Sequence, residues 1–276
     1  MNGEKVPRVS VVMSTYNRSA LLSRAIESIR TQTFTDWELI ITDDASTDGT
    51  WKMLQEYAAK DARIKPMPSA KEDLHYVAGI LNAGIARACG EYIARLDDDD
   101  YWIDVDKLAK QVAYLDAHPD CVIIGTGVIV MDGADKERYR YLKAETDTEI
   151  RAGALSSSPF ASSTVLYRKS TALAVGGYEK QYAEDWILWL KIGTQGTMYN
   201  LQEYSIGYLM AGQNKSWEHQ RPHAKTLVGI VVRFRRDYPH FLHAYAVNLI
   251  ALLYTYLPAF LHKALYPLAS RLKKVL

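Results

Sequence analysis

Residues 91–100 read Glu-Tyr-Ile-Ala-Arg-Leu-Asp-Asp-Asp-Asp, a short apolar run that ends in four consecutive carboxylates. Like charges at this density repel one another unless a cation lies among them. Side chains at i and i+2 of an extended segment point to the same side, so Asp97 and Asp99 can face one site. Carboxylate oxygens favour Mg²⁺ or Mn²⁺. The stretch predicts a strand whose carboxyl end carries a cation site, although an acidic run is also typical of a solvated loop.

The sequence on either side of this strand alternates between short apolar runs and segments with helical spacing. The expected strands cover residues 9–13, 38–42, 91–96, 122–130 and 164–167, and the expected helices cover 22–29, 51–58 and 81–88, with a further helix beginning near residue 184. Such alternation predicts an α/β fold with a mostly parallel sheet flanked by helices. The loops at the carboxyl ends of the strands are expected to carry the chemistry.

Composition sets the broad class of the protein. The chain has 276 residues, of which 48% are hydrophobic and 24% charged, which is ordinary for a globular protein and excludes collagen, coiled coil and disorder. Two cysteines, Cys89 and Cys121, are too few for a disulfide framework, which indicates a reducing compartment. The N-terminal residues contain no apolar stretch typical of a signal peptide, so we expect a cytoplasmic catalytic body.

Charge is distributed unevenly along the chain. The net charge of +1 gives no indication of a nucleic-acid partner. However, residues 215–276 contain ten basic and only two acidic side chains, so this segment carries +8 and residues 1–214 carry −7. Charge asymmetry of this kind often marks where a partner binds. The basic tail therefore indicates an anionic partner, and the acidic body indicates a cation.

The tail also contains a strongly apolar stretch, residues 244–261, with 15 apolar residues of 18 and with Pro258 inside it. A spanning helix needs roughly 20 apolar residues, so a segment lying in the plane of an anionic membrane surface is favoured over a span. The alternative is a helical hairpin packed on the body or on a second subunit as a homo-oligomer. We accordingly expect two parts, residues 1–216 as the catalytic domain and residues 217–276 as a basic, apolar helical appendage.

A second acidic site lies at residues 43–49, Asp-Asp-Ala-Ser-Thr-Asp-Gly. It resembles a calcium loop only in part, because the twelfth position counted from Asp44 is Gln55 and the preceding segment is a strand. A nucleotide pocket suits these residues better, since a carboxylate accepts hydrogen bonds from a base N–H or a ribose hydroxyl. Capping of the next helix by Ser46 or Asp48 is the structural alternative.

A third acidic site is Glu184-Asp185, at the start of an apolar helix. Acids at this position stabilise the helix dipole. A carboxylate here can also act as the general base that deprotonates an attacking hydroxyl. Gly176-Gly177 upstream would allow a tight turn that brings the helix start towards the cation site.

These sites, in this order, resemble the family 2 glycosyltransferases, which have the GT-A fold. The resemblance covers residues 7–216. It includes Val9-Ser-Val-Val-Met-Ser-Thr-Tyr-Asn-Arg18, residues 32–34 and 37–39, Asp43-Asp-Ala-Ser-Thr-Asp-Gly-Thr50, and Leu81-Asn-Ala-Gly-Ile-Ala-Arg-Ala-Cys-Gly-Glu-Tyr-Ile93 leading into the acidic run. Gly176-Gly-Tyr178 and Glu184-Asp185 complete it.

The resemblance implies an inverting transfer of a sugar from a nucleoside-diphosphate donor, with a UDP-sugar expected first, to an acceptor hydroxyl, with Mn²⁺ or Mg²⁺ as cofactor. The basic, aromatic tail adds the expectation of a lipid-linked or polysaccharide acceptor and of a peripheral location at the inner face of the cell membrane. The residues that match the family's site are Thr15, Tyr16, Asn17 and Arg18 in the nucleoside loop, Asp44 at the base, Asp97 and Asp99 at the two ends of the metal motif, Asp185 as catalytic base, and Glu184 beside it. Asp98 stands where the family's motif usually has a small residue and Asp100 where a further acid is common, so the choice of ligand stays open, with Asp99 the first choice and Asp98 assigned to the donor.

The chain departs from the family at Leu209 and Ala211, where many members carry Arg and His. Whether this loop supplies a third metal ligand is therefore open, with His219 or His223 as substitutes.

Two other functions are alternatives to sugar transfer. A nucleotidyltransferase is disfavoured because the chain has no glycine- and lysine-rich phosphate loop near its N-terminus. A catalytically inactive nucleotide- or carbohydrate-binding protein is disfavoured by the presence of both Asp99 and Asp185.

Overall fold

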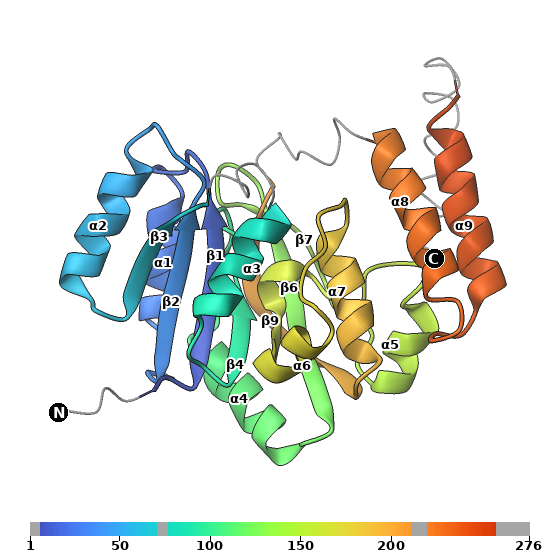
Figure 1. Cartoon of the computed structure of the whole chain (residues 1–276), viewed down its shortest axis with the longest axis horizontal. Coiled ribbons are helices and arrows are strands. Elements are labelled where there is room, and N and C mark those ends of the chain that lie inside the picture. Colours follow the sequence, from blue (N-terminus) through green and yellow to red (C-terminus); the bar gives the residue numbers. More distant parts are fainter. Residues whose placement is uncertain (1–5, 71–76, 211–219, 258–276) are drawn as a thin grey trace.

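The computed structural model describes residues 6–70, 77–210 and 220–257 (Figure 1). Within these residues the strands form a single mixed sheet of nine strands. They are β1 Val9–Thr15, β2 Trp37–Asp43, β3 Ile64–Pro68, β4 Tyr92–Arg95, β5 Tyr101–Trp102, β6 Cys121–Met131, β7 Glu137–Tyr141, β8 Leu166–Arg168 and β9 Thr197–Leu209.

The strand order is β3-β2-β1-β4-β8-β6-β9-β5, and β7 pairs with β6 outside this path. The first four strands are parallel, whereas β8 is antiparallel to both of its neighbours. In the register of β1, Thr15 lies opposite Asp43 of β2 and Val12 lies opposite Arg95 of β4. The carboxyl ends of these three strands therefore meet at one edge, where ligands of open α/β sheets bind.

Helices cover both faces of the sheet. They are α1 Leu22–Arg30, α2 Thr50–Lys60, α3 Val77–Arg87, α4 Lys107–Ala117, α5 Asp147–Gly153, α6 Lys169–Ala174, α7 Glu184–Gly193, α8 Gln220–Arg233 and α9 Phe241–Tyr254, with a 3-10 turn, η2, at Ser162–Thr164.

The buried side chains divide into two cores, one on each face. Alternate residues of a strand point to opposite faces, so Val11 packs in the core under α1, α2 and α4, while Val12 packs in the core under α3, α5 and α7. The first core takes its helical side chains from residues such as Leu22 and Leu108, and the second from residues such as Leu81. The predicted α/β fold is confirmed.

Most predicted elements are present with small shifts of their bounds. The predicted strand at 164–167 starts only at Leu166, because Ser162–Thr164 form the η2 turn. The sequence analysis did not identify β3, whose Pro66 and Pro68 lack the N–H groups of an interior strand. This strand lies at the end of the sheet order, where prolines are tolerated.

In the tail, α8 and α9 lie side by side at one end of the molecule, next to α5 and α7 (Figure 1). Ile230, Phe234 and Ala244 belong to the same hydrophobic core as α7. Tyr238 Oη donates a hydrogen bond to Leu190 O at 2.7 Å. None of the helices in the described residues is long and apolar enough to cross a membrane. The predicted apolar segment from Pro258 onward lies outside the described residues.

Candidate active site at the carboxyl edge of the sheet

The loops after β1 and β2 are joined by hydrogen bonds. Asn17 N–H donates to Ser46 Oγ at 2.9 Å, and Thr47 N–H donates back to Asn17 Oδ1 at 2.8 Å. Asn17 adopts a left-handed backbone, with φ 52°, to make this pair. Ser46 N–H also donates to Asp43 Oδ2 at 3.0 Å. The two loops are thus held together by Asn17, Ser46 and Asp43. From the sequence alone, this structural role could not be distinguished from contact with a nucleoside.

Asp48 lies in the second loop, two residues before α2 begins at Thr50. Its carboxylate accepts hydrogen bonds from Thr50 N–H at 3.0 Å and from Ser19 N–H at 3.2 Å. Hydrogen bonds led by the Thr50 hydroxyl lower the pKa of Asp48 to about 2. The capping of this helix by Ser46 or Asp48 is not found, since its N-cap residue is Gly49 and no side chain caps it. Asp44, which is only 6% exposed, lies beside Thr15, whose carbonyl accepts the Asp44 N–H at 2.8 Å.

The four consecutive aspartates have four different surroundings. Asp100 is 3% exposed, and it accepts hydrogen bonds from Ser163 Oγ at 2.5 Å and from Leu209 N–H at 3.4 Å. Asp98 is 13% exposed and lies 3.5 Å from Arg18 Nε. Burial and the Asp99 charge raise the pKa of Asp98 to about 6. Asp97 and Asp99 are the two with about a third of their side chains exposed, 34% and 33%.

Arg95 is a buried cation next to this run. Its guanidinium, 5% exposed, donates to Asp97 Oδ1 at 2.9 Å through Nη2 and at 3.2 Å through Nε. Burial would lower the pKa of Arg95, but the Asp97, Glu184 and Asp185 charges act more strongly together and raise it well above the usual value. Arg95 therefore interacts electrostatically with Asp97 of the acidic run and with Glu184 and Asp185 at the start of α7. A charged residue within an apolar strand was the available sequence signal, and it was missed.

Asp185 is held by two hydrogen-bond donors at the start of α7. Ser162 Oγ donates to Asp185 Oδ2 at 2.6 Å, and the N–H of Trp186 donates to Oδ1 at 2.7 Å. Two donors on the two carboxylate oxygens fix the orientation of the Asp185 side chain. The preceding Ala183 has a left-handed backbone with φ 56°, which turns the chain into the helix.

Glu184 differs from its neighbour. Burial and the Asp185 charge raise the pKa of Glu184 to about 7, and Arg95 partly offsets this rise. A carboxyl with this pKa is partly protonated at neutral pH. Two adjacent acids with separate environments can therefore take separate roles.

Lys143 was not predicted as a site residue. It follows β7 and donates from Nζ to Ser158 O at 2.9 Å. Burial lowers the pKa of Lys143, and the Asp185 charge opposes that effect, so the ammonium lies within electrostatic range of Asp185. Ser162 and Ser163 were missed too, because a serine pair in a loop carries no sequence signal.

The histidines proposed as a third ligand do not extend the acidic site in the described residues. His219 lies outside them. The ring of His223 lies edge-on to the ring of Tyr182, with a centroid distance of 6.3 Å. Throughout the described ranges there is no group of three or more His, Cys, Asp or Glu arranged to hold a metal.

A pair of carboxylates nevertheless fits a divalent cation that is shared with a substrate. Mg²⁺ at nucleotide sites is usually held by one or two carboxylates, with phosphate oxygens and water completing the shell. Asp97 and Asp99 provide such a pair, since both side chains are partly exposed. Burial and, to a smaller extent, the Asp97 charge raise the pKa of Asp99. These two carboxylates are thus of the donor type that Mg²⁺ or Mn²⁺ shares with phosphate oxygens.

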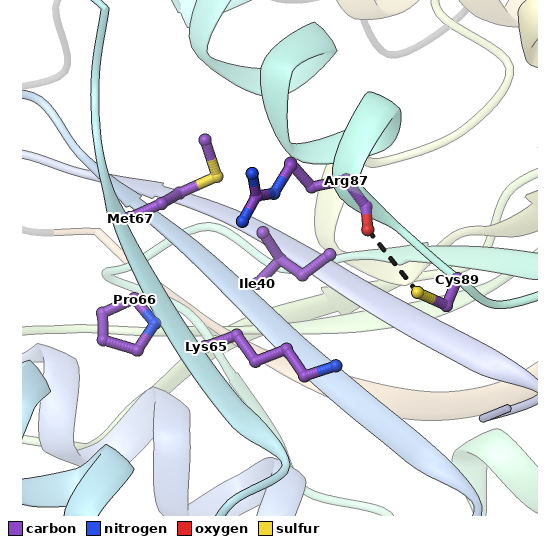
Figure 2. A pocket seen from close by; sticks show the side chains of 6 residues that line it. All are labelled: Ile40, Lys65, Pro66, Met67, Arg87 and Cys89. Carbon is purple, nitrogen blue, oxygen red and sulfur yellow. Dashed lines mark hydrogen bonds between the residues drawn. The ribbon is translucent and has the colours of Figure 1, made fainter. Parts of the chain in front are cut away.

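A cavity of about 260 Å³ lies elsewhere (Figure 2). It is lined by Ile40, Lys65, Pro66, Met67, Arg87 and Cys89. Lys65 is paired with Glu38 at 2.7 Å, and none of the predicted site residues lines the cavity. The acidic groups at the carboxyl edge, rather than this cavity, form the candidate active site.

With this geometry in view, comparisons with known proteins define the class. Residues 10–174 match the sequence profile of glycosyl transferase family 2. The chain belongs to this family and is a glycosyltransferase with the GT-A fold. Family membership sets aside the nucleotidyltransferase alternative.

Individual relatives extend the match over most of the chain. EpsE of Bacillus subtilis, named as a glycosyltransferase, is 38% identical over 203 residues, which are 71% of each chain. The amylovoran biosynthesis glycosyltransferase AmsE of Erwinia amylovora is 29% identical over 219 residues, 76% of this chain and 80% of AmsE.

Solved structures share the fold at low sequence identity. S. aureus TarS 1–349 in complex with UDP-GlcNAc superposes with a TM-score of 0.67 at 19% identity, over 86% of this chain and 69% of that one. The match to the longer TarS structure spans 43% of its length. The mannosyltransferase PcManGT of Pyrobaculum calidifontis, solved with GDP-Man and Mn²⁺, gives 0.66 at 21% identity, over 89% and 72%.

Proposed function

We propose that this protein transfers a sugar from a nucleoside-diphosphate donor to a hydroxyl of a glycan or lipid-linked acceptor, with inversion at the anomeric carbon. The observation that carries the proposal is the arrangement of three acidic groups around one edge of the sheet. These are the loops after β1 and β2, the run Asp97–Asp100 after β4, and Asp185 at the start of α7. Asp97 of the run and Asp185 both interact electrostatically with Arg95.

The donor is assigned to the loops after β1 and β2. Tyr16, 42% exposed, offers an aromatic face to a base, and the buried Asp44 offers a carboxylate to its N–H groups. Thr15, Asn17 and Arg18 complete this side, with Arg18 Nη2 lying 3.7 Å from Asp99. The structures of TarS with UDP-GlcNAc and of PcManGT with GDP-Man support a nucleotide sugar as donor class, and UDP-sugars are the first choice.

Asp99 and Asp97 would hold Mn²⁺ or Mg²⁺, and Asp98 would face the donor between them. When bound, the cation offsets the negative charge that builds up on the leaving diphosphate. PcManGT, solved with Mn²⁺, supports this assignment. Arg18 adds a permanent positive charge on the same side, since it lies within 4 Å of both Asp98 and Asp99.

Asp185 is assigned as the general base. It takes the proton of the acceptor hydroxyl while that oxygen forms a bond to the anomeric carbon, and the bond from this carbon to the diphosphate oxygen breaks on the opposite face. The electron pair leaves with the nucleoside diphosphate, so one displacement inverts the configuration. Hydrogen bonds from Ser162 Oγ and Trp186 N–H orient the Asp185 carboxylate before the proton moves.

The acceptor class rests on relatives and on the tail. AmsE is named for amylovoran biosynthesis and B. subtilis TuaG for teichuronic acid biosynthesis, which supports a role in cell-surface polysaccharide synthesis. The outer face of α9 exposes Leu242, Ile250 and Leu253, at 78%, 61% and 58%. We assign this face to an anionic membrane at its cytoplasmic side, with residues 1–216 as the catalytic domain and 217–276 as the part that bears the membrane face.

A donor panel with two site variants tests the function. UDP-glucose, UDP-galactose, UDP-GlcNAc and GDP-mannose are each incubated with Mn²⁺, and release of the nucleoside diphosphate is measured. Asp185→Asn should lose at least 100-fold in turnover while UDP binding in calorimetry stays within threefold. Asp99→Ala should lose the Mn²⁺-dependent part of UDP binding. Asp120→Asn, at an exposed position directly before β6 and so at the edge of the sheet opposite the site, is the matched control.

Three results would contradict the proposal. Near-normal turnover of Asp185→Asn removes this residue as the base. UDP affinity that Mn²⁺ does not change, in wild type and Asp99→Ala alike, removes the metal assignment. Binding of a donor with no turnover of any donor, in the presence of lipid-linked acceptors, would favour the inactive binding protein.

A further inference from the structure

Two consecutive serines in η2 contact the two halves of the acidic site. Ser162 and Ser163 lie on a single 3-10 turn between α5 and β8, and neither belongs to the acidic motifs. Their Cα atoms are about 3.8 Å apart, as for any adjacent residues joined by a trans peptide. Groups bonded to these two side chains are therefore held at a nearly fixed separation.

Ser162 contacts the base. Its Oγ donates to Asp185 Oδ2 at 2.6 Å, and the other carboxylate oxygen accepts the N–H of Trp186 at 2.7 Å. The backbone donor belongs to the same helix as Asp185, so it fixes the carboxylate only relative to α7. The Ser162 hydroxyl comes from another part of the chain. Of the two donors, it is therefore the one that fixes Asp185 relative to the sheet.

Ser163 contacts the acidic run at both ends. Its Oγ accepts the N–H of Asp97 at 3.1 Å and donates to Asp100 Oδ2 at 2.5 Å. Ser163 is 2% exposed, so water does not replace these bonds at low cost. One hydroxyl thus closes the turn that presents Asp97 and Asp99.

The turn itself is anchored to the body. Trp102 Nε1–H donates to Ser163 O at 3.1 Å, and Gln111 Nε2–H donates to Thr164 O at 2.9 Å. The Gln111 side chain is in turn bonded by the buried ammonium of Lys107 at 2.7 Å. With its carbonyls held in this way, η2 moves with β5 and α4 and not independently.

We propose that Ser162 and Ser163 are positioning residues that set the distance between the proton-accepting carboxylate and the carboxylates facing the donor diphosphate. The inference rests on the proposed function. Ser162 acts through Asp185 and so governs turnover, whereas Ser163 acts through the acidic run and so governs binding of the nucleoside diphosphate. A misplacement of about 1 Å in such a site can cost on the order of 100-fold in rate.

The test compares Ser162→Ala and Ser163→Ala in hydrolysis of the best donor of the panel and in calorimetry with UDP and Mn²⁺. Ser162→Ala should lower kcat about 10- to 100-fold with donor KM and UDP affinity within twofold. Ser163→Ala should weaken UDP binding at least fivefold and change kcat at saturating donor less than threefold. Ser162→Thr, which keeps the hydroxyl, should recover most of the rate. Ser170→Ala, an exposed serine in α6, is the control.

A double variant separates positioning from general destabilisation. If Ser162 acts through Asp185, then adding Ser162→Ala to Asp185→Asn causes no further loss, while adding Ser163→Ala still weakens UDP binding. If Ser163→Ala does not fold, Ser163→Cys gives the same UDP comparison, since its thiol is only a weak donor and acceptor.

Specific outcomes overturn the inference. One such outcome is that Ser162→Ala and Ser163→Ala lower kcat and UDP affinity to the same extent. Another is that Ser162→Ala lowers the rate of Asp185→Asn by the same factor as it lowers the wild-type rate. Either outcome shows a merely structural role. The proposed function fails separately, if the wild-type protein turns over no donor or if Asp185→Asn stays active. A fully active Ser162→Ala beside an inactive Asp185→Asn removes the inference alone.

Discussion

Asp97, Asp98, Asp99 and Asp100 are chemically identical, and their surroundings alone separate them. Asp100 is buried against Ser163, Asp98 is nearly buried beside Arg18, and Asp97 and Asp99 keep exposed oxygens. The sequence analysis named Asp97 and Asp99 from strand geometry and from the family resemblance. It placed Asp98 at the donor and gave Asp100 no role, because the partner Leu209 of Asp100 lies 109 residues away.

Removal of the buried cation should destabilise the fold. Arg95→Met keeps an unbranched apolar side chain but leaves Asp97 without its partner, so we expect a loss of about 3 kcal/mol in the free energy of unfolding. Urea denaturation measures this loss. The matched control is Arg8→Met, which breaks an exposed pair with Asp116 and should cost below about 1 kcal/mol. Equal losses for the two variants would show that Arg95 is not an essential counter-ion.

Glu184 should make stability depend on pH. Its pKa is about 7 in the folded protein, above the ordinary value of 4.5. Between these values the unfolded chain is ionised while the folded protein retains the proton, so the free energy of unfolding falls as pH rises from 4.5 to 7. Glu184→Gln removes this pH dependence. The free energy of unfolding of Glu184→Gln, relative to that of wild type, should therefore grow by about 2–3 kcal/mol between pH 4.5 and pH 7.

The measurement is urea unfolding at pH 4.5, 5.5, 6.5 and 7.5 in EDTA. Glu56→Gln, at an exposed position of α2, controls for the loss of a carboxylate. A difference between Glu184→Gln and wild type that stays constant with pH would contradict the raised pKa.

At the scale of elements, the loop at residues 176–183 is held from two sides before α7 begins. Asn82 of α3 exchanges two hydrogen bonds with the backbone of Tyr178, at 2.8 and 2.9 Å. Glu179 pairs with Arg233 of α8 at 2.7 Å and with Lys191 of α7 at 3.2 Å. The helix α7, which carries the proposed base Asp185, is thereby connected to both α3 and α8.

A side chain at Gly177 should disrupt this loop. Gly177 has φ +65°, and an added Cβ would lie 2.5 Å from Asn82 Oδ1. Gly177→Ala should therefore cost about 1–3 kcal/mol in stability and reduce turnover, because Asn82 must release Tyr178. Thermal unfolding and donor hydrolysis report both effects. Gly133→Ala, where an added Cβ meets open space, should change neither. An unaffected Gly177→Ala would show that the loop adjusts freely.

At the scale of the whole molecule, the tail closes the core. Ile230, Val231 and Phe234 pack in the same cluster as Trp186 and Trp189 of α7. Truncation after Ser216 would therefore expose core residues, and it cannot separate membrane binding from folding. The packing that was weighed as an alternative is present for residues 220–257, while the outer face of α9 stays exposed.

Substitution of that outer face tests the membrane assignment without opening the core. The triple variant Leu242→Glu, Ile250→Glu and Leu253→Glu changes only exposed side chains. We expect wild-type thermal stability and at least a tenfold loss of binding to vesicles of equal parts phosphatidylglycerol and phosphatidylcholine. Leu173→Glu, at an exposed leucine of α6, is the control. Unchanged vesicle binding by the triple variant would remove α9 as the membrane face.

The sequence by itself determined the α/β alternation and the three acidic motifs, because strand and helix periodicity and the motif residues are local along the chain. Only the tertiary structure decided which aspartates stay exposed, that Arg95 pairs with Asp97 within electrostatic range of Glu184 and Asp185, and that α8 packs in the same core as α7. Ser163 and Asp100 are 63 residues apart in sequence. Contacts over such separations depend on how the whole sheet brings the strands together, and no local pattern encodes them.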